Sequence, residues 1–96
     1  VAWVNFNGTN GSIRSAFNVS SVTRNGTGNY NVNFTNALAD ANYAIVLGAG
    51  MGNTSTANYA VGPQNSVPTT TTFQMITSIN SSTVQDSNYA SAAIFR

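Results

Sequence analysis

The chain has 96 residues, of which 42% are hydrophobic and only 5% are charged, and its formal net charge is +1. This length corresponds to one domain with one hydrophobic core, and the composition is that of a folded chain. Histidine, cysteine, lysine and glutamate do not occur, and the acids are Asp40 and Asp86. Most groups that act as general acids, nucleophiles or metal ligands are therefore missing, so we expect no enzymatic activity, no metal and no cofactor.

The small number of charged residues also limits which partners we expect. The three arginines form no basic stripe, so we do not expect nucleic-acid binding. No apolar run reaches the roughly 18 residues of a membrane span, so we do not expect membrane insertion either. A surface with so little charge protects a monomer weakly against association, and we expect copies of the chain to cover parts of it. Because the chain opens on Val1 and not on methionine, we expect a piece of a longer protein.

The first quarter of the chain contains one clear strand. Residues Ala2–Asn7 alternate apolar and polar side chains, which predicts a half-buried strand, and residues 8–12 end it. Residues 13–17 fit either a single helical turn or an extended connection.

The clearest predicted element is a hairpin. Residues 18–23 lead into the turn segment 24–28, where Asn25-Gly26 is the strongest short hairpin signal. The chain returns through residues 29–35, where apolar and polar residues alternate strictly. This alternation places Tyr30, Val32 and Phe34 on one face and Asn31, Asn33 and Thr35 on the other. A bulge near Ser20-Ser21 would bring the outgoing strand into register.

The second half of the chain holds further strand signals. Residues 36–42 form a connection with room for a helical turn at 37–39. The continuous apolar run 43–47 predicts a strand covered on both faces, followed by a glycine-rich loop at 48–56. Three more strands are predicted at 59–61, within 69–79 and at 89–95. The sequence therefore predicts a single all-β domain over residues 1–96, a small antiparallel β-sandwich of about seven strands.

Single aromatic and acidic residues have simple structural interpretations. We expect Trp3 to anchor the core or an interface, and Tyr30 and Tyr43 to lie in the core. Tyr59 and Tyr89 lie near loop edges, where either could face a ligand. Asp40 and Asp86 lie in turn-like stretches, where we expect them to accept hydrogen bonds from the local backbone.

Several segments resemble a known family. They are residues 3–8 (WVNFNG), 17–22 (FNVSSV), 25–28 (NGTG) with Tyr30, 32–35 (VNFT), 41–43 (ANY) and 93–95 (AIF). Together they resemble the C-terminal domain of tail fibres of bacteriophages, of a kind common in marine and cyanobacterial phages, and related virion fibre proteins. The resemblance implies a homotrimer on a virion, in a tail fibre or another appendage, as the C-terminal piece of a longer fibre protein.

The resemblance leaves three functions open. The first is a receptor-binding tip that contacts a host cell-surface glycan or an outer-membrane protein during adsorption. The second is a structural virion module without its own receptor, such as a fibre shaft cap or a capsid-attached fibre. The third, outside phages, is a bacterial adhesin domain.

Contact residues are expected in loops, because strand residues are committed to packing. The longest predicted loops are residues 48–58 and 62–70, and the tip of the hairpin is the second choice. In the trimer, we expect the apolar residues of segments 43–47 and 89–95 to face neighbouring copies. The candidate receptor-binding residues are Met51, Asn53, Asn58, Tyr59, Arg24 and Asn25.

Overall fold

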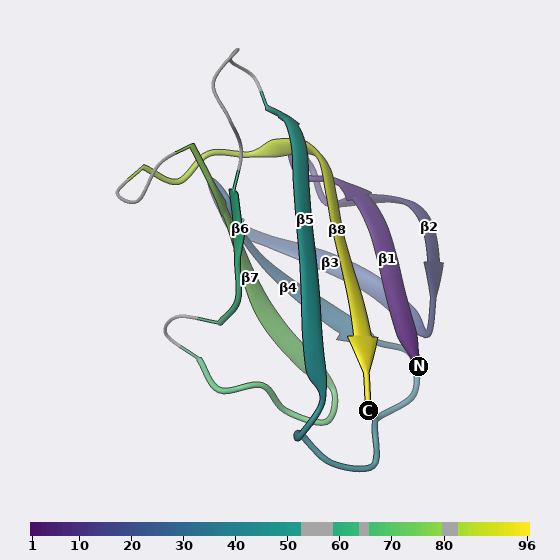
Figure 1. The fold of residues 1–96 in the computed structure, drawn as a ribbon. Coiled ribbons are helices and arrows are strands. Elements are labelled where there is room, and N and C mark those ends of the chain that lie inside the picture. Colours follow the sequence, from purple (N-terminus) through teal and green to yellow (C-terminus); the bar gives the residue numbers. More distant parts are fainter. Residues whose placement is uncertain (53–58, 64–65, 80–82) are drawn as a thin grey trace.

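The computed structural model describes residues 1–52, 59–63, 66–79 and 83–96. Within these ranges the chain forms eight strands in two four-stranded antiparallel sheets, which pack face to face as a small β-sandwich (Figure 1). The first sheet has the order β2-β1-β8-β5, and the second has the order β3-β4-β7-β6. The strands are β1 (Ala2–Asn7), β2 (Ser12–Phe17), β3 (Val19–Gly26), β4 (Asn29–Phe34), β5 (Ala44–Gly52), β6 (Tyr59–Val61), β7 (Thr72–Ser78) and β8 (Ser87–Phe95).

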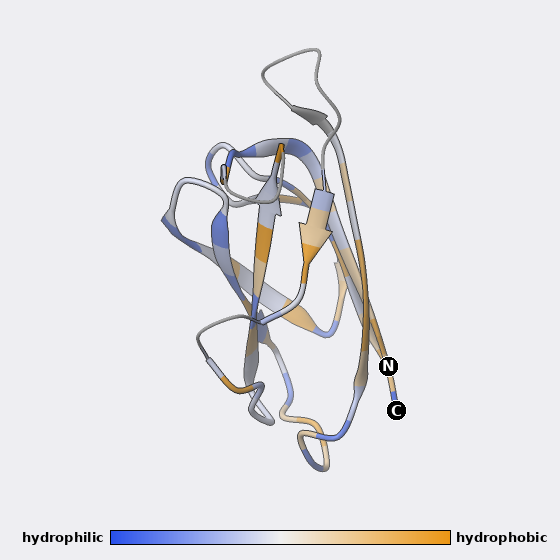
Figure 2. Cartoon of the chain, turned by 60° about the vertical axis from the view of Figure 1, so that its left-hand side comes forward, coloured by the Kyte–Doolittle hydropathy of each residue, from blue (hydrophilic) through white to orange (hydrophobic). Residues whose placement is uncertain are grey.

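The core lies between the two sheets and follows the period-2 alternation of the strands. β1 buries Val4 and Phe6, β4 buries Tyr30 and Val32, and β8 buries Ile94. Figure 2 shows the two layers side by side, with hydrophilic and hydrophobic residues alternating along the strands. The predicted inward faces of residues 2–7 and 29–35 are therefore confirmed.

Aromatic rings fill both ends of this core. The Phe6 and Tyr30 rings meet edge to face, with centroids 5.1 Å apart. Phe34 lies 5.7 Å from Tyr43 and 5.8 Å from Phe73. These separations are in the range that favours aromatic pairs. The expectation that Tyr30 and Tyr43 belong to the core is confirmed, since neither is more than 9% exposed.

The predicted hairpin exists, but its turn lies two residues later than expected. Gly26 pairs with Asn29, so the two-residue turn is Thr27-Gly28, and Gly28 has the positive φ of 66°. Asn25 lies in a bulge of β3, where the register shifts between Arg24 and Gly26. The predicted bulge near Ser20-Ser21 is confirmed by the shift between Val19 and Ser21.

Other predictions for the strands need correction. The ambiguous segment 13–17 belongs to β2, which raises the strand count from about seven to eight within the described ranges. Residues 48–52 continue β5 instead of forming a loop, because β5 pairs with β8 as far as Gly52. The run 43–47 is not covered on both faces within one chain, since Val46 is 57% exposed. No helical turn forms at residues 37–39.

The two ends of the chain lie close together at one end of the sandwich (Figure 1). The Val1 ammonium donates a hydrogen bond of 2.9 Å to the Ile94 carbonyl. The β1–β2 turn, the β3–β4 turn and the segment leading into β8 lie at the opposite end. Among the described residues, no helix has the length and hydrophobicity needed to cross a membrane.

The two glycines of the hairpin provide a matched test of the turn. A Cβ on Gly28 would lie 2.5 Å from the Thr77 carbonyl oxygen, at a φ that L-residues rarely adopt, whereas a Cβ on Gly26 would meet nothing within 4 Å. We expect Gly28→Ala to lower the free energy of unfolding by at least about 1–2 kcal/mol. Gly26→Ala should change it by less than about 0.5 kcal/mol. Chemical denaturation of both variants measures this, and equal losses would contradict the turn at Thr27-Gly28.

Candidate functional site

The charged side chains of this protein are engaged with each other or with an aromatic ring. Arg24 pairs with Asp86 at 2.8 Å, and Arg96 pairs with Asp40. The remaining arginine, Arg14, lies over the Tyr89 ring, 4.0 Å from its centroid. Arg14 also donates to the Asn88 carbonyl at 2.6 Å. None of the five charges is therefore without a nearby partner.

Asp86 is the most connected of these groups. Its carboxylate accepts hydrogen bonds from the Gly28 amide at 2.8 Å and from the Tyr30 hydroxyl at 3.0 Å, in addition to the Arg24 guanidinium. Burial by itself raises the pKa of this carboxyl, but the hydrogen bonds from Arg24, Gly28 and Tyr30 outweigh burial and lower it. Asp86 therefore stays ionised and binds the hairpin turn. The expectation that it accepts from local backbone is wrong, because its partners lie 56 to 62 residues away.

The Tyr30 hydroxyl links a third segment to this group. Its single proton is shared between the Asp86 carboxylate and the Gly8 carbonyl, which lies 2.8 Å from the hydroxyl oxygen, and the Gly8 amide donates to the Ser87 carbonyl at 2.8 Å. Burial, together with the neighbouring Asp86 carboxylate, raises the pKa of Tyr30 to about 12. A Cβ on Gly8 would lie 2.4 Å from both the Tyr30 hydroxyl and the Ser87 carbonyl oxygen, so only glycine fits there. This group of residues is structural.

Asp40 behaves as expected at the other end of the sandwich. It accepts from the Asn42 backbone amide at 2.9 Å, which confirms the local turn. The Arg96 side chain and this amide lower the pKa of Asp40 to about 2.

The outer face of the second sheet is an array of neutral amides and hydroxyls, which we call the amide face. The Asn25 amide nitrogen donates to the Oδ1 atoms of Asn29 at 3.1 Å and Asn31 at 3.0 Å. The Asn33 amide nitrogen donates to the hydroxyls of Ser21 and Thr23 at 3.0 and 3.1 Å. No charged side chain belongs to this array. The amide face consists of Ser21, Thr23, Asn25, Asn29, Asn31, Asn33, Thr72 and Gln74.

Strand β6 adds apolar groups at the edge of the amide face. Ala60 pairs with the buried Thr77, so Tyr59 and Val61 point to the outside of the sheet. The Tyr59 ring is 54% exposed. Val61 pairs with Ile76, which also pairs with Asn29 of the array. An exposed aromatic ring and a neutral hydrogen-bonding surface therefore share one side of the molecule.

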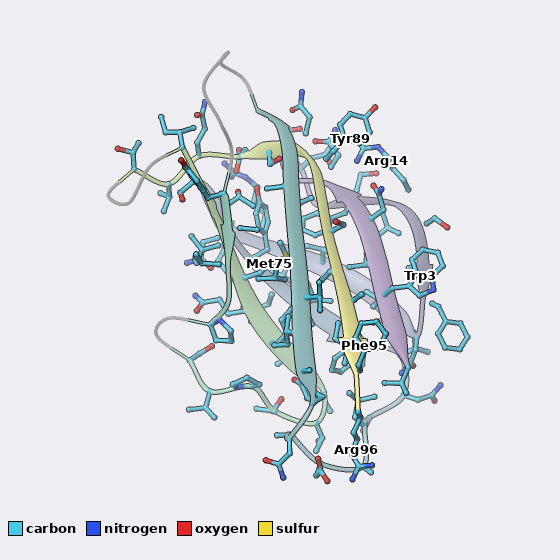
Figure 3. The ribbon with its side chains drawn as sticks, in the orientation of Figure 1. Trp3, Arg14, Met75, Tyr89, Phe95 and Arg96 are labelled. Atoms are coloured by element: carbon cyan, nitrogen blue, oxygen red, sulfur yellow. The ribbon has the colours of Figure 1, made fainter. Side chains whose placement is uncertain are left out.

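The outer face of the first sheet is apolar at the end near the chain termini, and we call this part the apolar face. Toward the other end the same side of the sheet carries the polar residues Asn5, Ser15 and Ser91 and the Arg14 side chain. The register aligns Phe17, Trp3, Ala93 and Val46 in one row across all four strands. Phe95 lies beside this row, and Figure 3 shows it with Trp3 on this side of the sheet, with Arg14 and Tyr89 together at the upper end. Trp3, Phe17, Val46 and Phe95 are 44% to 59% exposed, and Tyr89 at the other end of this side is 47% exposed.

The apolar face is not smooth. A shallow hollow of about 380 Å³ lies between Trp3 and Val46, with Gly48, Ser91 and Ala93 among the residues that line it. Trp3 is thus not part of the core of the chain, and its alternative role as an interface anchor remains a prediction.

The structure brings some of the predicted contact residues together and separates others. Tyr59 and Asn25 lie on the outside of the same sheet, on β6 and β3. Arg24 is held by Asp86 instead of being presented as a free charge. Met51 belongs to β5 of the other sheet. Asn53 and Asn58 lie outside the described residues.

Sequence reasoning missed the asparagines that form the centre of the amide face. The alternation of Asn29, Asn31 and Asn33 with apolar residues was the available signal, and it correctly predicted an outward face. Their connection to Asn25 depends on the bulge in β3, which no local pattern places at that residue.

Two kinds of surface, an apolar row and an array of neutral amides, are the chemical features that the described residues present. The described residues contain no group of three or more side chains that could hold a metal ion. Comparison of the chain with family models, with curated proteins and with solved structures finds no match. The chemistry of the two outer faces is therefore the main basis for assigning a function.

Two aspartates with arginine partners allow a matched stability test. Both have a pKa below the ordinary value, so the folded state binds fewer protons than the unfolded chain in this range, and stability falls as pH drops from about 5 to about 2. Asp86→Asn should lower the free energy of unfolding at pH 7 by about 1–3 kcal/mol. The variant removes the carboxylate that accepts hydrogen bonds from Arg24, Gly28 and Tyr30. Asp40→Asn should cost less, since solvent screens that exposed pair.

Urea denaturation of the wild type and both variants between pH 2 and pH 7 measures these effects. Each variant should remove part of the pH dependence, and Asp86→Asn should cost more stability at pH 7 than Asp40→Asn. A larger effect of Asp40→Asn would contradict the role assigned to Asp86.

Proposed function

We propose that this domain is a non-catalytic module of a homotrimeric virion fibre that contacts the host cell surface during adsorption. The observation that carries this proposal is the contrast between the two outer faces of the sandwich. One carries a row of apolar and aromatic side chains at the end near the chain termini, and the other is an uncharged array of amides and hydroxyls. The family resemblance of segments 3–8, 17–22 and 25–28 supports the virion setting.

The apolar face supports the assembly part of the proposal. Contiguous exposed apolar side chains on a small protein mark an interaction surface. Aromatic residues are enriched and charged residues are depleted in the cores of protein interfaces, which matches the row of Phe17, Trp3, Ala93 and Val46. In a trimer closed around these faces, the amide faces of the three copies turn outward. The segments 43–47 and 89–95 then contribute Val46, Ala93 and Phe95 to the contacts.

The outward amide face supports the receptor-binding part. A structural module without its own receptor, such as a fibre shaft cap or a capsid-attached fibre, remains the second candidate, since the apolar face would serve it equally well. A bacterial adhesin domain is the third. The position of the domain on the virion distinguishes the first two candidates. If the domain is a receptor-binding tip, an antibody against it should label the distal end of a tail appendage. Labelling of the capsid or the baseplate would favour the structural module.

The assembly is tested by the mass of the domain in solution. Sedimentation equilibrium at micromolar concentration should give the mass of three chains. Val46→Asp should produce monomers, because an unpaired carboxylate in an apolar interface is costly. Thr23→Asp, which places the same charge on the exposed amide face, should remain a trimer. A wild-type protein that stays monomeric, or equal behaviour of the two variants, would contradict the proposed interface.

A further inference from the structure

We propose that the amide face is a binding site for a neutral glycan, with Tyr59 as its aromatic edge. This inference rests on the proposed function for its biological setting, since it names the ligand class that the domain would contact on a cell. The site itself is argued from the contacts on the outer face of the second sheet.

The amides of this face are held in fixed orientations by one another. The Asn29 Oδ1 atom accepts from both Asn25 and Gln74, each at 3.1 Å, and Asn31 Oδ1 accepts from Asn25 at 3.0 Å. An asparagine side chain offers two donors and an acceptor with two lone pairs. These contacts use the oxygen ends of Asn29 and Asn31 and leave their Nδ2 donors without a partner among the described residues.

Hydrogen-bond acceptors lie beside these donors. Asn25 uses both Nδ2 hydrogens on its neighbours, so its Oδ1 acceptor is left without a partner in the described part of the chain. The Ser21 and Thr23 oxygens accept from Asn33, which leaves their hydroxyl hydrogens available. Donors and acceptors thus lie side by side on strands β3 and β4 and are oriented before a ligand arrives. Such preorganisation reduces the entropic cost of binding.

The absence of charged side chains from the amide face indicates which class of ligand it would bind. Anionic groups such as phosphate or carboxylate are normally recognised by arginine or lysine, often through bidentate pairs. The amide face has no such group, and nearby Arg24 is paired with Asp86. Sugar hydroxyls both donate and accept, which matches neutral amides and hydroxyls. The observations therefore favour an uncharged saccharide over an anionic one.

The edge of the face provides the apolar contact that a sugar ring also needs. One face of a pyranose ring presents C–H groups, and these pack against aromatic rings. Tyr59 on β6 is 54% exposed, and Val61 beside it is 38% exposed. The register connects Val61 through Ile76 to Asn29, so the apolar edge on β6 and the amide donors on β4 lie on the same side of the sheet, with β7 and its buried Gln74 and Ile76 between them. A ligand that contacts both spans two strand spacings, roughly 10 Å. A short oligosaccharide could contact both.

Each site should bind weakly. Neutral hydrogen bonds contribute only about 0.5–1.5 kcal/mol each, since water competes for the same groups. Three outward sites on one trimer could raise the avidity for a cell surface by roughly 10²–10⁴ where the spacing of the glycans permits.

The test uses isothermal titration calorimetry with defined hexasaccharides. The neutral probes are maltohexaose, cellohexaose, chitohexaose and mannohexaose, and the anionic probe is hexagalacturonate. We expect at least one neutral probe to bind and the anionic probe not to bind. Asn31→Asp replaces the outward donor by a carboxylate oxygen of the same shape, so it should weaken binding by at least about tenfold. Tyr59→Ala should weaken it by a similar factor.

Asn10→Asp is the matched control, because Asn10 lies in the β1–β2 turn and uses its Oδ1 atom, which aspartate keeps, to accept from Ser12 at 2.8 Å. This variant should bind as the wild type does. Binding that survives both Asn31→Asp and Tyr59→Ala, or preference for the anionic probe, would overturn the proposed site.

Binding of the labelled domain to host cells separates this inference from the proposed function. Cell binding without binding of any neutral probe would overturn the glycan site and leave the proposed function standing, with a surface protein as the partner. Loss of cell binding in Asn31→Asp but not in Asn10→Asp would support both.

Discussion

Asp86 accepts hydrogen bonds from Gly28, Tyr30 and Arg24, so one carboxylate joins the turn of the β3–β4 hairpin to the segment that leads into β8. Tyr30 extends this connection to the β1–β2 turn through the Gly8 carbonyl. The hairpin belongs to the second sheet, whereas the β1–β2 turn and β8 belong to the first, so Asp86 and Tyr30 together join the two sheets at one end of the sandwich. Because the turn is fixed there, the register of β3 on β4 is fixed as well, and this register positions the asparagines of the amide face.

The pairing of charges has a second consequence for the surface. Two ion pairs and one cation–π contact engage all five charged side chains. Apart from Arg14, which is held over Tyr89, the outer faces carry neutral groups, which divide into the apolar face and the amide face. We expect assembly to cover the first face, and hydration or a ligand to satisfy the second. The proposed trimer and the proposed glycan site are two results of the same scarcity of charge.

Local sequence patterns predicted much of the fold. The alternation at Ala2–Asn7 and Asn29–Phe34 identified both strands and their inward faces, because a period of two residues is a direct consequence of strand geometry. The turn was displaced from Asn25-Gly26 to Thr27-Gly28, since the space around Gly28 is set by Thr77 and Gln85 from a distant part of the chain. The exposure of Val46 was not predicted either, because an apolar run does not indicate which of its faces a neighbouring sheet covers.

The binding surface was less predictable for the same reason. Tyr59 and Asn25 were expected to serve recognition, but only the order β3-β4-β7-β6 shows that they share a side of the molecule. Arg24 was a candidate contact residue in the sequence, and its partner Asp86 is 62 residues away. Contacts between such distant positions depend on tertiary packing, which no local signal encodes.

The central claim is that the apolar face is covered by other copies while the amide face remains open. Trp3 is the one tryptophan of the chain and lies on the apolar face, so its fluorescence reports on that surface directly. Acrylamide quenching of Trp3, followed as the protein is concentrated from nanomolar to micromolar, is the most direct measurement. The account predicts that quenching falls and the emission shifts to shorter wavelength as the trimer forms. A trimer in which Trp3 remains as accessible to acrylamide as in the dilute protein would contradict it.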